Sequence, residues 1–222
     1  MDRKNSGNLI AFSSWSGGKE STLSLYLAKL SGVKVPYLLN MTEESGRFSR
    51  SHGVCLRLLE LQAESVGALL LFSETSWEEY EQKFRKKIFQ LRKEGINAGI
   101  FGDIDLQEHR EWVERICSKE GIKSIFPLWG EERERLLRKF INLGFKAIVV
   151  SVCRNFLDES FLGRLIDEDF IRDLKSRGVD LCGERGEYHT FVFDGPFFKK
   201  KVRFKTGRKI SRDSYLFLEI KC

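Results

Sequence analysis

The sequence predicts an α/β protein with a doubly wound parallel sheet and a smaller C-terminal α+β domain. Short apolar runs alternate with amphipathic stretches of roughly 10–20 residues through most of the chain, a pattern typical of βαβ units. A glycine-rich turn separates the first apolar run from the first amphipathic stretch. After residue 178 the pattern changes to glycines, an alternating stretch and an Asp-Gly-Pro turn, which indicates a second, smaller part.

Length and composition indicate a globular protein. The chain has 222 residues, 41% hydrophobic and 32% charged, enough for one domain with a smaller appendage. No apolar run reaches the length of about 18 residues that marks a membrane span. The first 12 residues lack the apolar core of a signal peptide. We therefore expect a cytoplasmic protein that does not contact a membrane.

The first five elements follow from the apolar pattern. Residues 8–13 are short and apolar, which predicts a strand. Residues 20–30 place four apolar side chains on one helical face, and residues 54–66 are also helical. Residues 35–40 and 68–72 are the second and third predicted strands.

A long charged helix is predicted over residues 76–95. Ser76 is placed to cap it, and Glu79 completes a capping box. Gly95 is placed to end it.

The alternation then continues. We expect a fourth strand at residues 97–101, a helix at 106–121 and a fifth strand at 124–129. A helix at 132–144 and a strand at 145–152 extend the same pattern.

The last part of the chain is predicted to contain the strands 188–193 and 214–220. We divide the chain into a sheet domain, residues 1–125, and a C-terminal domain, residues 126–222.

The cysteines do not suggest a disulfide framework, because their number is odd and no C-x-x-C is present. They are Cys55, Cys117, Cys153, Cys182 and Cys222. His52 and Cys55 form one H-x-x-C, but no second pair completes a zinc site. We expect separate reduced thiols.

The formal charge of +6 is concentrated in residues 199–212, which contain no acid. Such a segment can contact nucleic acid or an acidic protein. A solvated hairpin is the alternative.

The turn "SSWSGGKES", residues 13–21, has the composition of a phosphate site. Ligands of open parallel sheets bind beyond the carboxyl ends of the strands, and a helix N-terminus attracts anions. Gly17 and Gly18 allow close backbone approach, and Lys19 adds a full positive charge. Hydroxyl groups come from Ser14, Ser16 and Ser21. The alternative is a structural βα turn without a ligand.

Glu20 is the unusual residue of this turn. The Walker A loop is excluded, because Ser13 stands at its first glycine and an acid follows the lysine. An acid beside phosphates is stable if magnesium bridges them, and Asp103, after the fourth strand, is a second carboxylate for the same crevice. Glu20 is otherwise simply a favourable acid in the first turn of a helix.

Several motifs, taken together and in this order, resemble one known family. "SWSGGKES" resembles the PP-loop, S-G-G-x-D-S, of the N-type ATP pyrophosphatases. With "SRSHG" (49–53), "GDI" (102–104), "FPLWG" (126–130) and "CGERGEYHTFVFDGPFF" (182–198), the chain resembles the diphthine–ammonia ligase family, also called diphthamide synthetase.

This resemblance implies a HUP-like sheet domain of the adenine nucleotide alpha hydrolase type. It also implies a C–N ligase that uses ATP and Mg²⁺ and releases AMP and pyrophosphate. The acyl substrate is then a carboxylate on the modified histidine of elongation factor 2, and ammonia, supplied as ammonium, displaces AMP. Two residues depart from the family pattern: Glu20 replaces the usual Asp, and His189 stands where better-known ligases carry an acid.

The resemblance also suggests residue roles on the nucleotide side. Gly17, Gly18, Lys19 and Ser21 would stabilise the leaving pyrophosphate, with Ser14 and Ser16 beside them. Glu20 and Asp103 would hold magnesium. Asn40 and Met41, at the end of the second strand, and Gly102, after the fourth, would contact the nucleotide.

The remaining roles concern the acyl substrate and ammonia. Arg50, Ser51 and His52 form a polar loop near the phosphates or the acyl group. Glu184 and Glu187 would accept the proton of ammonium, next to Tyr188, with His189 and Thr190 toward the substrate. Lys19, His52, Glu184 and Glu187 are thus the catalytic candidates.

Two other functions stay open at this point. One is a PP-loop ATP pyrophosphatase that modifies tRNA or a small acid. The other is a non-catalytic nucleotide-binding sensor. In each case we expect a homodimer.

Overall fold

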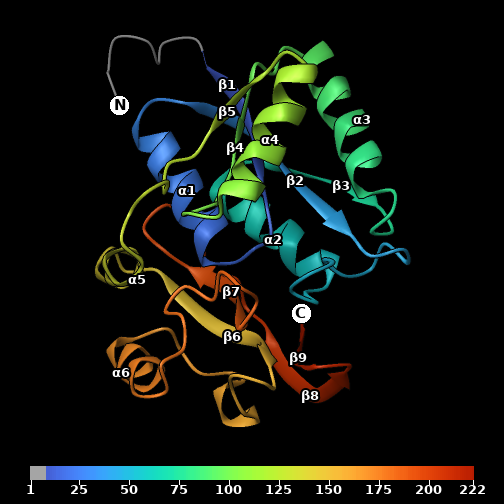
Figure 1. Ribbon diagram of the computed structural model, residues 1–222. Coiled ribbons are helices and arrows are strands. Elements are labelled where there is room, and N and C mark those ends of the chain that lie inside the picture. Colours follow the sequence, from blue (N-terminus) through green and yellow to red (C-terminus); the bar gives the residue numbers. More distant parts are fainter. Residues whose placement is uncertain (1–8) are drawn as a thin grey trace.

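A computed structural model describes residues 9–222 and contains two sheets (Figure 1). The first is a five-stranded parallel sheet with the order β3-β2-β1-β4-β5. Its strands are β1 (Ile10–Ser14), β2 (Lys34–Thr42), β3 (Leu69–Glu74), β4 (Ala98–Ile100) and β5 (Lys123–Ile125). The predicted α/β class is confirmed. Asn8, the first residue of the predicted first strand, lies outside the described residues.

The strand order reverses between β1 and β4. β2 and then β3 lie on one side of β1, and β4 and then β5 lie on the other side. β1 therefore pairs with both β2 and β4, and Ser13 lies opposite Ile100. The loops that follow β1 and β4 leave the same sheet edge at a topological switch point, where α/β sheets bind ligands.

Helices cover both faces of this sheet (Figure 1). α3 (Tyr80–Lys93) and α4 (Gln107–Lys119) contribute to one hydrophobic cluster, which includes Phe12, Phe84 and Ile116. α1 (Lys19–Leu30) and α2 (Leu56–Val66) contribute to the other.

The second sheet is antiparallel, with the order β7-β6-β9-β8. It consists of β6 (Lys146–Cys153), β7 (Tyr188–Asp194), β8 (Lys205–Arg212) and β9 (Tyr215–Lys221). α5 (Arg133–Asn142), a short 3₁₀ helix, η2 (Glu159–Phe161), and α6 (Glu168–Ser176) complete this part.

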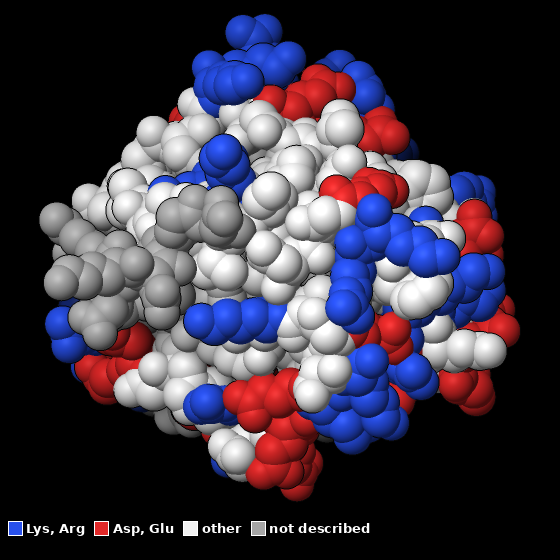
Figure 2. Space-filling model, turned by 90° about the horizontal axis from the view of Figure 1, so that it is seen from above, with Lys and Arg blue, Asp and Glu red and all other residues white. Residues whose placement is uncertain are grey.

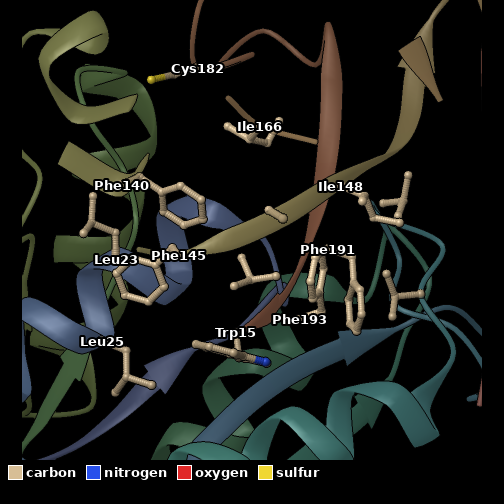
Figure 3. Close-up of a cluster of buried hydrophobic side chains, with 14 of the residues drawn as sticks. Trp15, Leu23, Leu25, Phe140, Phe145, Ile148, Ile166, Cys182, Phe191 and Phe193 are labelled. Carbon is tan, nitrogen blue, oxygen red and sulfur yellow. The ribbon is translucent and has the colours of Figure 1, made fainter. Parts of the chain in front are cut away.

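One hydrophobic cluster spans both parts. It contains Trp15 and Leu23 from the sheet domain and Phe140, Phe145 and Phe191 from the C-terminal part (Figure 3). The two sheets therefore share a core and hold each other in place. The division into residues 1–125 and 126–222 stays a prediction.

Three predicted elements were wrong in detail. The helix α3 begins at Tyr80, because the Ser76 hydroxyl accepts a hydrogen bond from the Glu79 amide (3.2 Å) and closes a turn before the helix. The strand β5 ends at Ile125, and the Trp129 amide donates to the Phe126 carbonyl in a turn.

The third error concerns residues 145–152, which do not extend the parallel sheet. They form β6, which lies at the centre of the antiparallel sheet between β7 and β9. β6 is buried on both faces, so its apolar run looks like that of a central parallel strand.

The basic segment 199–212 includes β8, an exposed strand at the outer edge of its sheet. On another face, seen from above in Figure 2, acidic and basic side chains are interspersed with uncharged surface. The five cysteines are unpaired in the described chain. No helix within residues 9–222 has the length and hydrophobicity needed to cross a membrane.

Candidate functional site

A pocket of about 340 Å³ lies at the switch point, where the ends of β1 and β4 meet a loop of the C-terminal part. That volume falls in the range of small-molecule sites. The pocket is lined by Ser14, Ser16, Lys19, Glu20, Ser21, Ser51, His52, Gly102, Asp103, Leu106, His109, Cys182, Gly183, Glu184, Gly186, Tyr188, His189 and Thr190.

The two glycines of the turn shape this pocket without lining it. Gly17 has a φ of +81°, which favours glycine, and a side chain there would meet Gln62 Oε1 at 2.7 Å. A Cβ on Gly18 would lie 2.6 Å from Cε1 of His52. Neither glycine is among the lining residues. They allow His52 and Gln62 to pack against the start of α1.

Lys19 is a buried and fully paired cation. Only 4% of it is exposed. Its Nζ donates to the Cys182 carbonyl oxygen (2.6 Å), lies 2.8 Å from Oε1 of Glu20, and sits 4.3 Å from the centre of the Tyr188 ring. Burial alone would lower the pKa of Lys19, but the charge and hydrogen bond of Glu20, together with Tyr188 and Cys182, outweigh it, so the pKa is raised. Lys19 is therefore a fixed positive charge at neutral pH.

The loop that approaches Lys19 is held by Asp180. Its carboxylate accepts hydrogen bonds from the amides of Cys182 (3.0 Å) and Glu184 (3.0 Å). Arg133, at the start of α5, pairs with Asp180 and also with Asp105 (2.7 Å), which follows β4. These contacts hold the backbone of Cys182 and Glu184 against the parallel sheet.

Three carboxylates line the pocket: Glu20, Asp103 and Glu184. Burial, together with the charges of Glu20 and Asp103, raises the pKa of Glu184 to about 8, although Lys19 and Arg133 oppose the shift. In the absence of a cation, the pocket thus favours a protonated Glu184.

The donor set fits magnesium bound with a nucleotide. Within the described residues, no group of three metal-ligating side chains is arranged to hold an ion by itself. Magnesium commonly uses one or two carboxylates and completes its shell with phosphate oxygens and water. Glu20 and Asp103, whose side chains are 22% and 20% exposed, are the residues that would hold it.

Two histidines stack in the pocket. The rings of His52 and His189 lie 4.5 Å apart. Nδ1 of His52 lies 2.9 Å from the Thr190 carbonyl oxygen, which can only accept, so we assign the proton to Nδ1. Thr190 Oγ1 in turn accepts from the Lys19 amide (3.1 Å).

Both histidines are neutral. Burial lowers the pKa of His52 to about 4 and that of His189 well below its usual value. With Nδ1 protonated, Nε2 of His52 is a hydrogen-bond acceptor.

The structure brings most of the predicted residues to the pocket. Those among its lining residues are Ser14, Ser16, Lys19, Glu20, Ser21, Ser51, His52, Gly102, Asp103, Glu184, Tyr188, His189 and Thr190. The hydroxyl of Tyr188 donates to the Leu181 carbonyl (2.5 Å) and so supports the loop.

Four predicted side chains, those of Asn40, Met41, Arg50 and Glu187, do not line the pocket. The side-chain amide of Asn40 donates to the Trp15 carbonyl (2.6 Å), and the Met41 carbonyl accepts from the Arg50 amide (3.2 Å). Both hydrogen bonds lie outside the pocket, and the nucleotide role of Asn40 and Met41 stays a prediction.

Arg50 and Glu187 are also directed elsewhere. The guanidinium of Arg50 stacks on Trp77, 4.9 Å from the ring centre. Glu187 is buried and accepts from the Arg185 amide (3.0 Å). Only one of the two predicted acids in this loop therefore reaches the pocket.

Sequence reasoning missed His109 and the carbonyl of Cys182. His109 lies in the first turn of α4, with Nδ1 3.5 Å from Oδ1 of Asp103, and this contact raises its pKa. Its position at the start of the helix after β4 was a usable signal, because that helix begins at the switch point. Nothing in the sequence marks a backbone carbonyl.

Comparisons with known proteins agree on one family. The family model described as the diphthamide synthase N-terminal domain matches residues 10–124, and the one described as the diphthamide synthase C-terminal domain matches residues 132–222. A Mus musculus protein named diphthine–ammonia ligase is 26% identical over 92% of this chain and 86% of its own length. The Bos taurus protein of the same name is 28% identical over 72% of this chain and 61% of its own length.

A solved structure from Methanocaldococcus jannaschii, named as a predicted subunit of tRNA methyltransferase, aligns over 87% of this chain and 100% of its own. Its TM-score is 0.46 and its sequence identity 19%, too low to assign an activity. The two family models are independent of that likeness and together match most of the chain. The chain belongs to the diphthamide synthase family, a family of enzymes.

Proposed function

We propose that this protein is an ATP-dependent diphthine–ammonia ligase. It would adenylate the carboxylate of diphthine on elongation factor 2, release pyrophosphate, and form the amide with ammonia. The observation that carries the proposal is the pocket itself, which combines a helix N-terminus and a fixed lysine with three carboxylates. The relatives named diphthine–ammonia ligase support the same reaction.

ATP is proposed to bind with its phosphates at the start of α1. The helix N-terminus and the Lys19 charge attract phosphate oxygens, and the hydroxyls of Ser14, Ser16 and Ser21 can donate to them. Magnesium, held by Glu20 and Asp103, would neutralise phosphate charge. Lys19 then stabilises the negative charge that develops on the leaving pyrophosphate.

Glu184 is proposed to act after ATP has been cleaved. The ammonia nitrogen forms a bond to the acyl carbon, the bond from that carbon to the AMP oxygen breaks, and its electron pair leaves with AMP. The nitrogen must lose one proton, and the Glu184 carboxylate can accept it. Burial raises the pKa of Glu184 above that of an ordinary carboxylate, which suits this task.

The acyl substrate is proposed to enter beside Ser51 and the stacked histidines. Because His52 and His189 are neutral, they accept and donate hydrogen bonds without adding charge. The reaction would take place in the cytoplasm, where translation factors are found. Nucleic-acid contact through residues 199–212 and a homodimer both remain predictions.

A direct assay tests this function. The protein is incubated with ATP, Mg²⁺, ammonium and diphthine-bearing elongation factor 2, and the nucleotides and the modified histidine are analysed by chromatography and mass spectrometry. AMP, pyrophosphate and the amide are expected. ADP as the main nucleotide product would exclude adenylation. AMP formation with tRNA or a small acid, but not with elongation factor 2, would favour the other ATP pyrophosphatase function, and ATP binding without turnover would favour the sensor.

A further inference from the structure

A second, much smaller cavity adjoins the pocket. Its volume is about 10 Å³, measured as the space open to the centre of a water-sized sphere. That is about the minimum needed for one water-sized molecule. Its walls are mainly buried apolar side chains: Leu23, Ile104, Leu128, Leu136, Leu137 and Phe140. They belong to the cluster in Figure 3, where Leu23, Phe140 and Cys182 are labelled.

The two cavities share one wall. Lys19, Glu20 and Cys182 line both of them. The Lys19–Glu20 ion pair and the hydrogen bond from Lys19 to the Cys182 carbonyl run along this wall. The small cavity therefore borders the larger pocket at these polar groups.

The walls select for a small neutral molecule. A cation such as ammonium would lose its hydration among six apolar side chains, and the Glu20 carboxylate at the edge of the cavity is already paired with Lys19. Water needs two to four hydrogen-bond partners in such a place. Ammonia is about the same size as water, and it is the one neutral reactant of the proposed reaction that this volume admits. Its N–H groups can donate to Glu20.

We propose that this cavity is a subsite for one neutral ammonia molecule, next to the pocket in which the substrate is adenylated. The inference rests on the proposed function and adds to it the position from which the nitrogen attacks. Ammonium would leave its proton in water before the nitrogen enters. The ammonia then forms the C–N bond as AMP departs, and the proton that the nitrogen releases passes to Glu184.

The test enlarges the cavity and offers a larger amine. Leu137→Ala removes part of the wall, so methylamine should fit. The ratio of kcat/KM for methylamine to that for ammonia is measured at saturating ATP, Mg²⁺ and diphthine-bearing elongation factor 2. One methyl group in an apolar pocket changes selectivity about 10–200-fold, so we expect the ratio to rise at least about tenfold. Leu137→Val, which removes a single methylene, should raise it less and is expected to stay folded.

A matched control is Leu174→Ala in α6. Leu174 is also fully buried in the same cluster but does not line the cavity. Its variant should keep the wild-type ratio. An unchanged ratio in a folded Leu137 variant, or an equal rise in the control, would overturn the ammonia subsite. If pyrophosphate is released normally in these experiments, the proposed function survives that result; if the wild type releases none, both proposals fail.

Discussion

The side-chain ammonium of Lys19 donates a 2.6 Å hydrogen bond to the backbone carbonyl of Cys182, 163 residues further along the chain. The lysine of the glycine turn therefore has two functions. It supplies positive charge to the pocket, and it ties the start of α1 to the loop that brings Glu184. Charge and position are linked in one side chain, so replacing it should affect both stability and binding.

Lys19→Met should lower the free energy of unfolding and weaken ATP binding. The substitution leaves Glu20 and the Cys182 carbonyl without their partner, which costs about 1–3 kcal/mol for a buried group. Urea unfolding measures the first effect and calorimetry with MgATP the second. The double variant Lys19→Met/Glu20→Gln should regain part of the lost stability, but it should not regain MgATP binding.

The control for this prediction is Lys34→Met. Lys34 is an exposed lysine at the start of β2, away from the pocket. Its replacement should change stability by less than about 0.5 kcal/mol. Equal ATP affinity in the wild type and Lys19→Met would remove the α1 turn as the phosphate site.

Gly18→Ala should disturb the pocket through His52. The new methyl group would lie 2.6 Å from Cε1 of His52, so the ring must move and its hydrogen bond to Thr190 must weaken. Gly18 has an ordinary φ of −91°, so backbone strain does not contribute. We expect a loss of stability of about 1–3 kcal/mol, as for overpacking.

A double-mutant cycle checks this explanation. In the His52→Ala background the added methyl has room, so Gly18→Ala should cost much less there than in the wild type. Additive losses of stability would show that the clash with His52 is not the cause.

Acid should destabilise the protein through its buried histidines. The pKa of His52 falls from 6.5 in the unfolded chain to about 4 in the folded protein. Between these values the unfolded chain binds more protons, so stability is present above pH 6.5 and is lost as the pH falls toward 4. The shift corresponds to a loss on the order of 3 kcal/mol for this residue.

Chemical unfolding at several pH values measures this loss. His52→Gln keeps a donor for the Thr190 carbonyl but cannot titrate, so its stability should depend less on pH across that window. His189, whose pKa is also lowered, accounts for part of the remaining slope. Parallel pH profiles for the wild type and His52→Gln would contradict the prediction.

Glu184 and Glu187 should differ sharply in their effect on amide formation. Glu184→Gln removes a proton acceptor in the pocket and should slow the amide step by about 10²–10⁴-fold. Glu187→Gln changes a buried side chain outside the pocket, and the rate should stay within a few-fold. Rapid-quench measurement of the amide step separates this effect from ATP binding, which should change little in both variants.

The pH dependence gives a second test of Glu184. Because the carboxylate form accepts the proton, the rate of the wild-type amide step, compared at equal concentrations of neutral ammonia, should rise with pH across the range in which Glu184 loses its proton. This rise should be absent from the residual activity of Glu184→Gln. A larger defect in Glu187→Gln than in Glu184→Gln would reverse the assignment.

The sequence predicted the fold because hydrophobic periodicity reports local burial, and most of these elements follow it. β6 shows the limit: its apolar run is compatible with either sheet, and only the pairing with β7 and β9 decides. α3 was predicted to begin too early. Ser76 and Glu79 do form a hydrogen bond, but it closes a turn that precedes the helix.

The candidate site was predictable where polar side chains lie at or just after the end of a strand. Ser14 ends β1, Glu20 follows β1 and Asp103 follows β4, so the topology brings them together. Glu184 and Glu187 were not separable, because the direction of each depends on a loop that turns at Gly183 (φ +69°) and Gly186 (φ +85°). That the Asn40 side chain contacts the Trp15 carbonyl could not be predicted, because the two residues are distant in sequence.

The outer strand β8 bears on how this protein behaves at high concentration. An open strand edge invites a second molecule to pair with it, and lysine side chains or a bulge discourage such pairing. β8 carries Lys205, Arg208, Lys209 and Arg212, and its register with β9 shifts between Thr206 and Lys209. Repulsion between these charges keeps two such edges apart in dilute salt. Polyanions or concentrated salt would screen this repulsion, so filaments or precipitates should form first under those conditions.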